Sequence, residues 1–425
     1  MKKKTKFNWF KLIAIIIVIQ MGSGSSLFAQ ISSLSLEEAK KIAIINNRDL
    51  KILRLNLQIA KEKSTEARAK AYPQLNSSLT YNINDQPKNL LRDRDYSQVT
   101  ISVDQTLFHL GIWAGIKAAK QFQKVEGLSG DRFQETLFFL VTETYLKILT
   151  TQKQLDVLKE LEKNTQEHLR NAQNFYNEGM VPKTDLLKTE LALNRVQRDL
   201  LTGNNEQQKL QTAFKILLGT NLDQDYQLQE VELQDLPIKD IKELQQEAIG
   251  KRNDLKVFLA KASYLENIRK AYQSRRYPNL SAFGSWNYTA DKFEAREHDM
   301  AGGIRLTMPI FNGFGITAQV AQAKSHLVQN QLQYEQLKAQ VNQEVEVACL
   351  DIKEARTNLE IAQKEVKQAE ENLRITNDLY KEAMSTTTDV IDAQTLLAQA
   401  RNHFNSARYG QILANQRLLL AVGGS

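Results

Sequence analysis

The sequence has 425 residues, one cysteine and a formal net charge of +7. Five lysines lie in the first eleven residues with no acidic residue beside them, so the rest of the chain carries only 7 − 5 = +2. This balance, with no basic cluster further on, argues against nucleic acid as a partner, and a single thiol excludes a fold held by disulfides.

Residues 1–29 are predicted to be a secretory signal peptide. The basic start is followed by the apolar run Leu12 to Ile19 and then by small residues before Ala29. The run is too short for an ordinary bilayer-spanning helix, although a short membrane anchor is the alternative. No cysteine stands at the predicted cleavage site, so we do not expect a lipid-anchored N-terminus.

The exported part of the chain contains the same pattern twice, at a shift of 204–205 residues. The chain has only six prolines, as expected for long helices. A period this long indicates a duplicated half rather than a short solenoid unit. The matching pairs are Asp49 and Asp254, Tyr72-Pro73 and Tyr277-Pro278, Leu169-Arg170 and Leu373-Arg374, Tyr176 and Tyr380, Met180 and Met384, Thr184-Asp185 and Thr388-Asp389, and Gly219 and Gly423.

Each repeat is predicted to contain three helices and two strands. The first repeat covers 30–219, with helices at about 34–71, 112–179 and 183–218 and strands at about 74–84 and 98–107. A linker, 220–239, follows. The second repeat covers 240–425, with helices at about 240–276, 316–383 and 387–422 and strands at about 279–289 and 300–310.

The helices differ greatly in length. The first is predicted to start at the N-cap Ser35, with Glu38 three residues on, and to end before Tyr72-Pro73. The second helix of each repeat has about 68 residues and is therefore about 100 Å long. Such helices need antiparallel neighbours along their whole length, as in a coiled-coil bundle. Cys349 falls inside one of them and is expected to be buried.

The four strands alternate between apolar and polar residues over about ten positions, the length that crosses an outer membrane at a tilt. An ordinary antiparallel sheet with one wet face is the alternative. Four strands cannot close a membrane barrel, which needs about eight or more, so chains would have to share one. Asp104 and Arg305, on the polar face, are then expected to line the lumen. The aromatic residues near the strand ends suit an interfacial girdle: Tyr81, Tyr96, Trp286 and Tyr288.

Two aspartates, Asp389 and Asp392, lie three residues apart at the start of the last helix and therefore on one face. One interpretation is helix capping, with Thr387 or Thr388 as N-cap and Asp389 in the first turn. This accounts poorly for Asp392, which lies too far into the helix. The other interpretation is that both carboxylates face a constriction, where rings of acidic groups attract cations.

The duplicated half, the Tyr-Pro before each strand pair, the long helices and the segment TTTDVIDAQTLLAQARNHF (386–404) resemble the TolC family of outer-membrane efflux and secretion channels. The resemblance covers essentially the whole exported chain. It implies a mainly α fold with a membrane β-barrel, built as a homotrimer with twelve strands in the outer membrane and twelve helices across the periplasm. It also implies partners: outer-membrane lipid, a periplasmic membrane-fusion adaptor and an inner-membrane transporter of the resistance-nodulation-division or ABC type.

The family resemblance also assigns roles near the periplasmic entrance. Asp389 and Asp392 match the positions of the family's acidic ring. The family closes this entrance through an aspartate in the first repeat, matched by Asp185, and a tyrosine and an arginine in the second. Tyr380 matches the tyrosine, but Ser385 stands where the arginine would align. The link is therefore expected to use hydrogen bonds or another basic residue, or to be weaker.

Catalytic and cofactor motifs are missing from the sequence. The five histidines have no metal-ligand spacing, and there is no nucleophile elbow or phosphate-binding loop. We expect no enzyme activity and no cofactor. The alternative function is a soluble periplasmic coiled-coil scaffold or adaptor, although such proteins usually have one hairpin rather than two copies, each with a strand pair.

Overall fold

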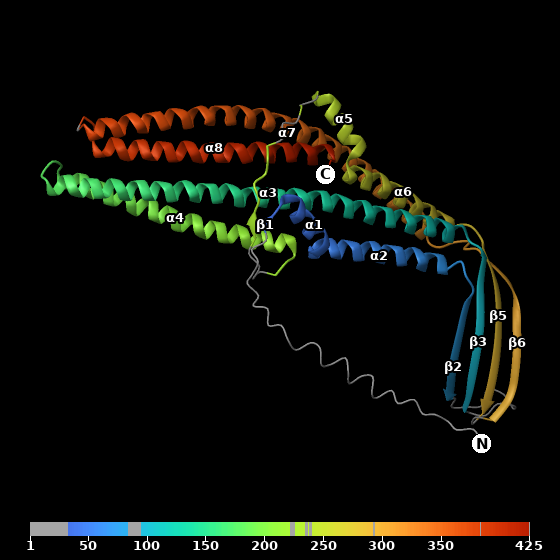
Figure 1. Ribbon diagram of the computed structural model, residues 1–425. Coiled ribbons are helices and arrows are strands. Elements are labelled where there is room, and N and C mark those ends of the chain that lie inside the picture. The colour runs from blue at the N-terminus through green and yellow to red at the C-terminus, as the bar shows by residue number, and fades with distance from the viewer. Residues whose placement is uncertain are drawn as a thin grey trace, which may run out of the picture.

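The computed structural model describes residues 33–83, 95–221, 226–233, 237, 240–291, 294–382 and 384–424. The predicted signal peptide, 1–29, lies outside the described residues. The molecule is elongated, with a sheet at one end and two helical hairpin turns at the other (Figure 1).

Each repeat has the same order of elements. The first contains α1 (Leu36–Asn46), α2 (Arg48–Ala69), β2 (Gln74–Ile83), β3 (Asp95–Phe108), α3 (Leu110–Asn177) and α4 (Lys183–Leu218). The second contains α5 (Ile241–Lys251), α6 (Asn253–Ser274), β5 (Asn279–Asp291), β6 (Glu294–Thr307), α7 (Gly315–Lys381) and α8 (Thr387–Val422). Between them, β4 (Gln227–Leu228) pairs in parallel with β1 (Ser33–Leu34) near the middle of the molecule.

The first helix of each repeat is broken, which corrects the prediction of continuous helices at 34–71 and 240–276. Asn47 ends α1 with a non-helical backbone (φ −55°, ψ 129°), and its side chain caps α2 by accepting from the backbone N–H of Leu50 at 3.0 Å. The break in the second repeat falls at Arg252. The predicted start was right: Ser35 forms a capping box with Glu38.

The breaks follow from contacts with the ends of the hairpin helices. Asn47 donates to the carbonyl of Leu217, and Arg252 donates to that of Ala421, the equivalent residue in the second repeat. Such C-terminal carbonyls have no partner within their own helix. Each break therefore places a side-chain donor against a carbonyl at the C-terminal end of α4 or α8.

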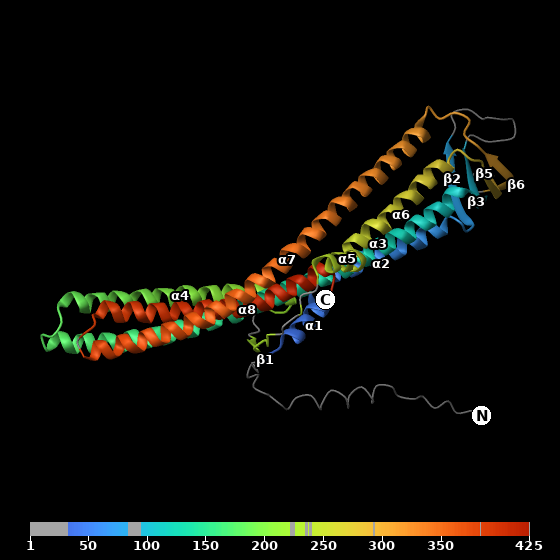
Figure 2. The same ribbon diagram turned by 90° about the horizontal axis from the view of Figure 1, so that it is seen from above.

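The long helices α3 and α7 have 68 and 67 residues and connect the sheet to the far turns. At 1.5 Å per residue each is about 100 Å long. In the far half, α3 pairs with α4 and α7 with α8; in the near half, α3 runs beside α2 and α6. Near the sheet, α7 runs beside α6, and Asn330 of α7 donates to the carbonyl of Phe258 on α6 at 3.1 Å (Figure 2). Val328 and Leu332, on either side of Asn330 in the chain, are exposed.

The four long strands form one antiparallel sheet in the order β2-β3-β5-β6. Paired residues share a face, so the row Ile101–Trp286–Met300 marks an apolar face and the row Thr100–Asn287–Asp299 a polar one. The outer strands β2 and β6 each have one edge without a partner in the described chain. Apolar side chains on them are exposed, among them Leu79 at 74% and Ile304 at 70%.

The register corrects one part of the aromatic prediction. Tyr96 pairs with Asn82, which places it on the polar face, whereas Tyr81 and Tyr288 lie on the apolar face. Trp286 lies in the middle of β5, stacked on Tyr288 at 5.8 Å between ring centroids. Only Tyr81 and Tyr288 thus combine the expected face with a position near the strand ends.

The buried core sits near the middle of the molecule, where the helices of both repeats meet. Tyr145 on α3 is fully buried, and its hydroxyl proton is shared between the carbonyl oxygens of Leu34 and Gln229, which lie 2.8 and 2.7 Å from the hydroxyl oxygen. This holds the linker against α3. Cys349 is fully buried in the neighbouring cluster, as predicted.

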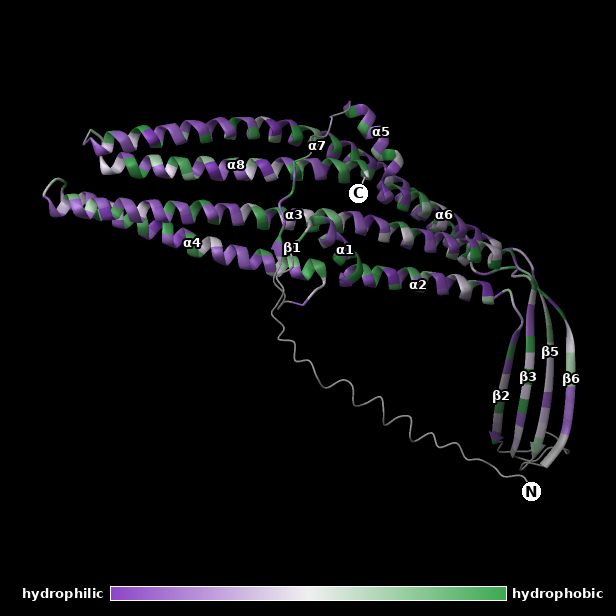
Figure 3. Ribbon diagram, in the orientation of Figure 1, coloured by the Kyte–Doolittle hydropathy of each residue, from purple (hydrophilic) through white to green (hydrophobic). Residues whose placement is uncertain are grey.

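Hydrophilic and hydrophobic residues are mixed along every long helix (Figure 3). Within the described part of the chain, none of the helices combines the length and the apolarity that a bilayer crossing requires.

Candidate functional site

The turns that join α3 to α4 and α7 to α8 lie together at the end of the molecule farthest from the sheet (Figure 1). Gly179 permits the first turn because it adopts a positive φ of 73°. Four of the five predicted entrance residues lie within a few residues of these turns, and Asp392 lies one helical turn further on.

Asp389 caps α8, and the N-cap is Thr386 rather than the predicted Thr387 or Thr388. The Asp389 carboxylate accepts from the backbone N–H of Thr386 at 2.8 Å and from its hydroxyl at 2.7 Å, which completes a capping box. Ser385 also donates to this carboxylate, at 3.2 Å. These hydrogen bonds, led by that from the Thr386 backbone, hold the pKa of Asp389 below its usual range. Asp389 is thus ionised, but its carboxylate is already hydrogen-bonded in the N-terminal cap of α8.

Asp392 lies one helical turn further on and is exposed. It has no hydrogen bond or ion pair to any residue in the described ranges. Capping therefore explains Asp389 and Ser385 and leaves Asp392 unexplained.

Tyr380 lies where the two repeats touch. Its hydroxyl is 3.3 Å from the hydroxyl of Thr387, and its ring packs against His168 and Phe175 of α3 at centroid distances of 5.1 and 6.0 Å. His168 and Thr387 are almost fully buried. This contact joins α3 to the start of α8.

Asp185 pairs with Lys188 rather than with Tyr380 in the part of the chain that is described. The Lys188 ammonium lies 3.4 Å from the Asp185 carboxylate and donates to the hydroxyl of Thr388, in the other repeat, at 3.2 Å. Lys188 was missed in the sequence, although the repeat shift aligns it with Asp392. The first repeat thus has a cation where the second has an anion.

Further contacts join the repeats along the hairpins. Arg401 on α8 pairs with Glu160 of α3 at 2.6 Å, and Gln154 of α3 donates to Ser406 of α8 at 3.4 Å. We call these pairs, with Lys188–Thr388 and the His168–Tyr380 packing, the inter-repeat contact.

The predicted lumen residues Asp104 and Arg305 share the polar face of the sheet. The Arg305 guanidinium lies over the Phe283 ring at 4.5 Å, which explains why this phenylalanine interrupts the polar row. The sequence prediction missed an acidic position on this face. Asn287 donates to Asp299 at 3.1 Å and accepts from Thr100 at 2.8 Å.

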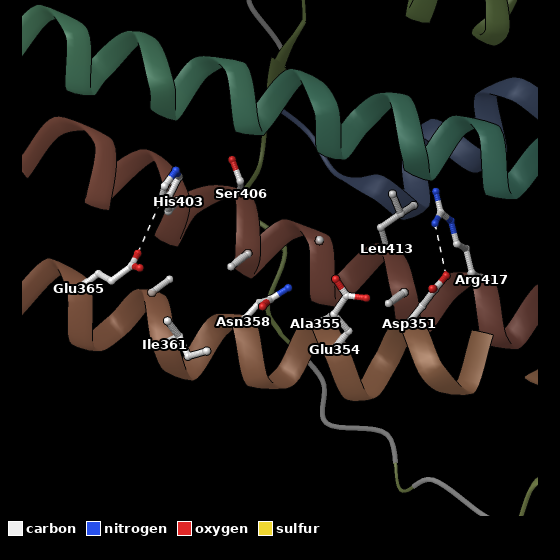
Figure 4. Close-up of a pocket in the computed structure, with 14 residues that line it drawn as sticks. Asp351, Glu354, Ala355, Asn358, Ile361, Glu365, His403, Ser406, Leu413 and Arg417 are labelled. Carbon is white, nitrogen blue, oxygen red and sulfur yellow. Dashed lines mark ion pairs between the residues drawn. The ribbon is translucent and has the colours of Figure 1, made fainter. Parts of the chain in front are cut away.

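A groove of about 600 Å³ runs between α7 and α8 (Figure 4). Small residues line it, among them Ala355 and Gly410, together with charged groups such as Glu354. Two ion pairs cross it, Asp351–Arg417 at 3.6 Å and Glu365–His403 at 3.4 Å. Small lining residues allow a further helix to approach closely. Among the described residues, no acidic, histidine or cysteine cluster is arranged to hold a metal ion.

Known proteins match both the sequence and this architecture. The sequence model of the family described as "Outer membrane efflux protein" matches residues 41–220 and 244–424, which together make up most of the chain and coincide with the two repeats. The chain belongs to the outer membrane efflux protein family. It is 23% identical to outer membrane protein TolC of Salmonella enteritidis, over 97% of this chain and 86% of that protein. The identity to TolC of Escherichia coli K12 is 22%, with the same coverage.

Solved channel structures share the fold. The Campylobacter jejuni CmeC outer membrane channel superposes with a TM-score of 0.81 at 18% identity, covering 92% of this chain and 85% of that one. The outer membrane protein VceC of Vibrio cholerae superposes with a TM-score of 0.79 at 17% identity, covering 92% of this chain and 96% of that one. The predicted TolC-family fold is thus confirmed, and the protein is an outer-membrane efflux channel with a periplasmic extension.

Proposed function

We propose that three copies of the chain form one outer-membrane channel that exports small molecules or proteins across the periplasm. The sheet supports this most directly. It has an exposed apolar face and two edges, on β2 and β6, that have no partner in the described chain. Open edges are not tolerated in lipid, and three four-stranded sheets joined edge to edge would give twelve strands.

The helices support the same assembly. Ile52, Leu55 and Ile59 form an exposed apolar stripe on α2, and α7 exposes Val328 and Leu332 near the sheet. Head-to-tail packing of α2 on α7 of the next chain would cover both stripes. A ring of this kind closes by rotation and leaves no free interface.

The far turns would then form the periplasmic entrance. Each chain contributes Asp185, Asp389 and Asp392 against Lys188, so these four residues give three chains a charge of 3 × (1 − 3) = −6. An acidic ring of this kind favours cations and disfavours anions. Tyr380 would hold the entrance residues of the two repeats together through Thr387, and Lys188 would supply the basic group missing at Ser385. Farther along, Asp104 and Arg305 would face the lumen of the barrel.

The partners in this proposal are a periplasmic membrane-fusion adaptor and an inner-membrane transporter of the resistance-nodulation-division or ABC type. The groove between α7 and α8 supports an adaptor with a helical hairpin, because the small residues that line it admit a helix. A photoreactive residue at Ser406, on the groove, should crosslink to such an adaptor in cells. The same residue at Glu360, exposed on α7 outside the groove, should not. Equal crosslinking at both positions would contradict the assignment.

The assembly is tested by separating membranes from cells that make the protein. The chain should appear in the outer-membrane fraction, and native mass spectrometry in mild detergent should give the mass of three chains. In planar bilayers the trimer should conduct ions. A soluble monomer in the periplasm would instead favour a coiled-coil scaffold, in which the strands form an ordinary sheet.

A further inference from the structure

His168 is a buried histidine at the contact between the two repeats. It lies on α3, ten residues before the turn at Glu178, and is only 5% exposed. Tyr380 of α7 packs edge-on against its ring at 5.1 Å, and Thr387 of α8 lies beside it. The imidazole is therefore enclosed by elements of both repeats.

One nitrogen of this imidazole has no partner. Nε2 is buried and makes no hydrogen bond to any residue in the described ranges. A neutral ring tolerates this, because an unprotonated nitrogen loses only an acceptor contact. A protonated ring would place an N–H donor and a positive charge in the same enclosed position, which is far less favourable.

Charged side chains do not compensate for this burial. Burial lowers the pKa of His168, and only a backbone hydrogen bond with Thr387 raises it. The charged groups nearest in the chain on the packed elements are Glu167 and Arg170 on α3, Asp378 and Lys381 on α7, and Asp389 on α8. Asp378 and Asp389 are already occupied, the first by Lys381 and Arg374 and the second by the α8 cap. On α4, Asp185 is paired with Lys188.

The site belongs to one repeat only. The residue equivalent to His168 in the second repeat is Asn372, which is exposed. Elsewhere the inter-repeat contact uses more exposed groups, such as Arg401 with Glu160 and Lys188 with Thr388. His168 is the member of this contact whose charge can change between pH 5 and 8.

We propose that His168 is a proton-binding site that weakens the inter-repeat contact when it is protonated, so that α3 separates from the α7–α8 turn in acid. An imidazole in the separated, hydrated state has a pKa near the ordinary value of about 6.5. Because the packed state binds the proton less well, its stability is complete above about 6.5 and falls as the pH is lowered. Each pH unit below that value shifts the equilibrium toward separation by up to about tenfold, until the lowered pKa is passed. The statement that this separation would widen a channel entrance rests on the proposed function. The separation of α3 from the α7–α8 turn does not depend on the proposed function.

The test measures the separation within one chain. Nitroxide labels at Glu178→Cys and Glu382→Cys, in a Cys349→Ala background, mark the ends of α3 and α7. Labelled chains are mixed with excess unlabelled chains, and pulsed electron paramagnetic resonance gives the distance distribution at pH 7.5 and 5.0. A longer distance should gain population at pH 5.0. An unchanged distribution would overturn the proposal, whether or not the protein conducts.

Two histidine variants isolate the site. His168→Gln cannot be protonated and should give the same distribution at both pH values. His403→Gln is the matched control, because His403 is exposed on α8 beside Glu365, and it should respond like the parent. A pH response that persists in His168→Gln would show that another group is responsible. Circular dichroism and native mass establish that each variant is folded and assembled as the parent is.

Discussion

Arg252 and Asn47 occupy equivalent positions in the two repeats, and replacing each by alanine should have unequal effects on stability. Both side chains donate to a carbonyl at the end of a hairpin helix. Arg252 is 2% exposed and also forms ion pairs with Glu344 and, at 2.6 Å, with Asp254. The second repeat has therefore replaced a neutral cap with a buried charge network.

The structure limits the size of the two effects. Removing one partner of a buried ion pair destabilises a protein by about 3–5 kcal/mol. In Arg252→Ala, Asp254 would keep its ion pair with Arg132 at 3.5 Å, and Glu344, which is half-exposed, can be rehydrated. The destabilisation by Arg252→Ala should therefore lie near the lower end of this range, at about 3 kcal/mol. Asn47→Ala removes a helix cap and one buried hydrogen bond, which together are worth about 1–2 kcal/mol.

The assay is urea unfolding followed by the helical circular dichroism signal of the solubilised protein. The midpoint should fall further for Arg252→Ala than for Asn47→Ala, with similar slopes. Equal midpoints would refute the reasoning, because they would mean that the charge network adds nothing to the cap.

Acid provides a second check on the same variant. Burial alone would raise the pKa of Asp254, but the hydrogen bond and charge of Arg252, together with the charge of Arg132, outweigh it and hold this pKa below its usual value. The stabilisation is therefore complete above about pH 3.9, the ordinary aspartate value, and is lost as the pH falls through the lowered pKa. The difference between parent and Arg252→Ala should shrink below about pH 4. A difference that stays constant in acid would contradict the assigned role of Asp254.

The channel itself gives three further predictions, all measured as ion selectivity in planar bilayers. Asp389→Asn with Asp392→Asn should lower cation preference and block by multivalent cations, by up to about fivefold per carboxylate in contact with the ion; an unchanged response would leave Asp389 as a helix cap alone. Lys188→Gln should raise cation preference, because it removes a positive charge from the same entrance, and a fall would refute its placement there. Arg305→Gln should also raise cation preference but leave block by multivalent cations unchanged, since Arg305 lies on the sheet, far from the turns. A change in this block would contradict the placement of Arg305 away from the entrance.

Periodicity was a sound guide to the strands, because a two-residue repeat fixes which side chains share a face. It could not assign Tyr96 correctly, since this residue lies at a strand end where the alternation has no apolar neighbour to confirm it. Phe283 broke the pattern for a reason that only the structure supplies: it supports Arg305 from the neighbouring strand.

The helix breaks and the entrance contacts depend on tertiary structure. Nothing in 34–71 stops a helix by propensity, and the break at Asn47 arises because α4 ends beside it. A sequence signal was nevertheless present, since asparagine followed two residues later by Asp49 is typical of a helix start. Likewise His168 and Lys188 lie far in sequence from Tyr380 and Thr388, so no local pattern could bring them together.

The central pairing of the sheet joins β3 of the first repeat to β5 of the second. Residues in contact there are far apart along the chain; Ser97 donates to the carbonyl of Ala290, 193 positions later. Contacts of such high sequence separation form slowly. In a chain that emerges N-terminus first into the periplasm, the β2–β3 pair therefore stays exposed until the second repeat has arrived and β5 can pair with β3. Biogenesis of this protein should accordingly depend on protection of the unfinished sheet during that interval.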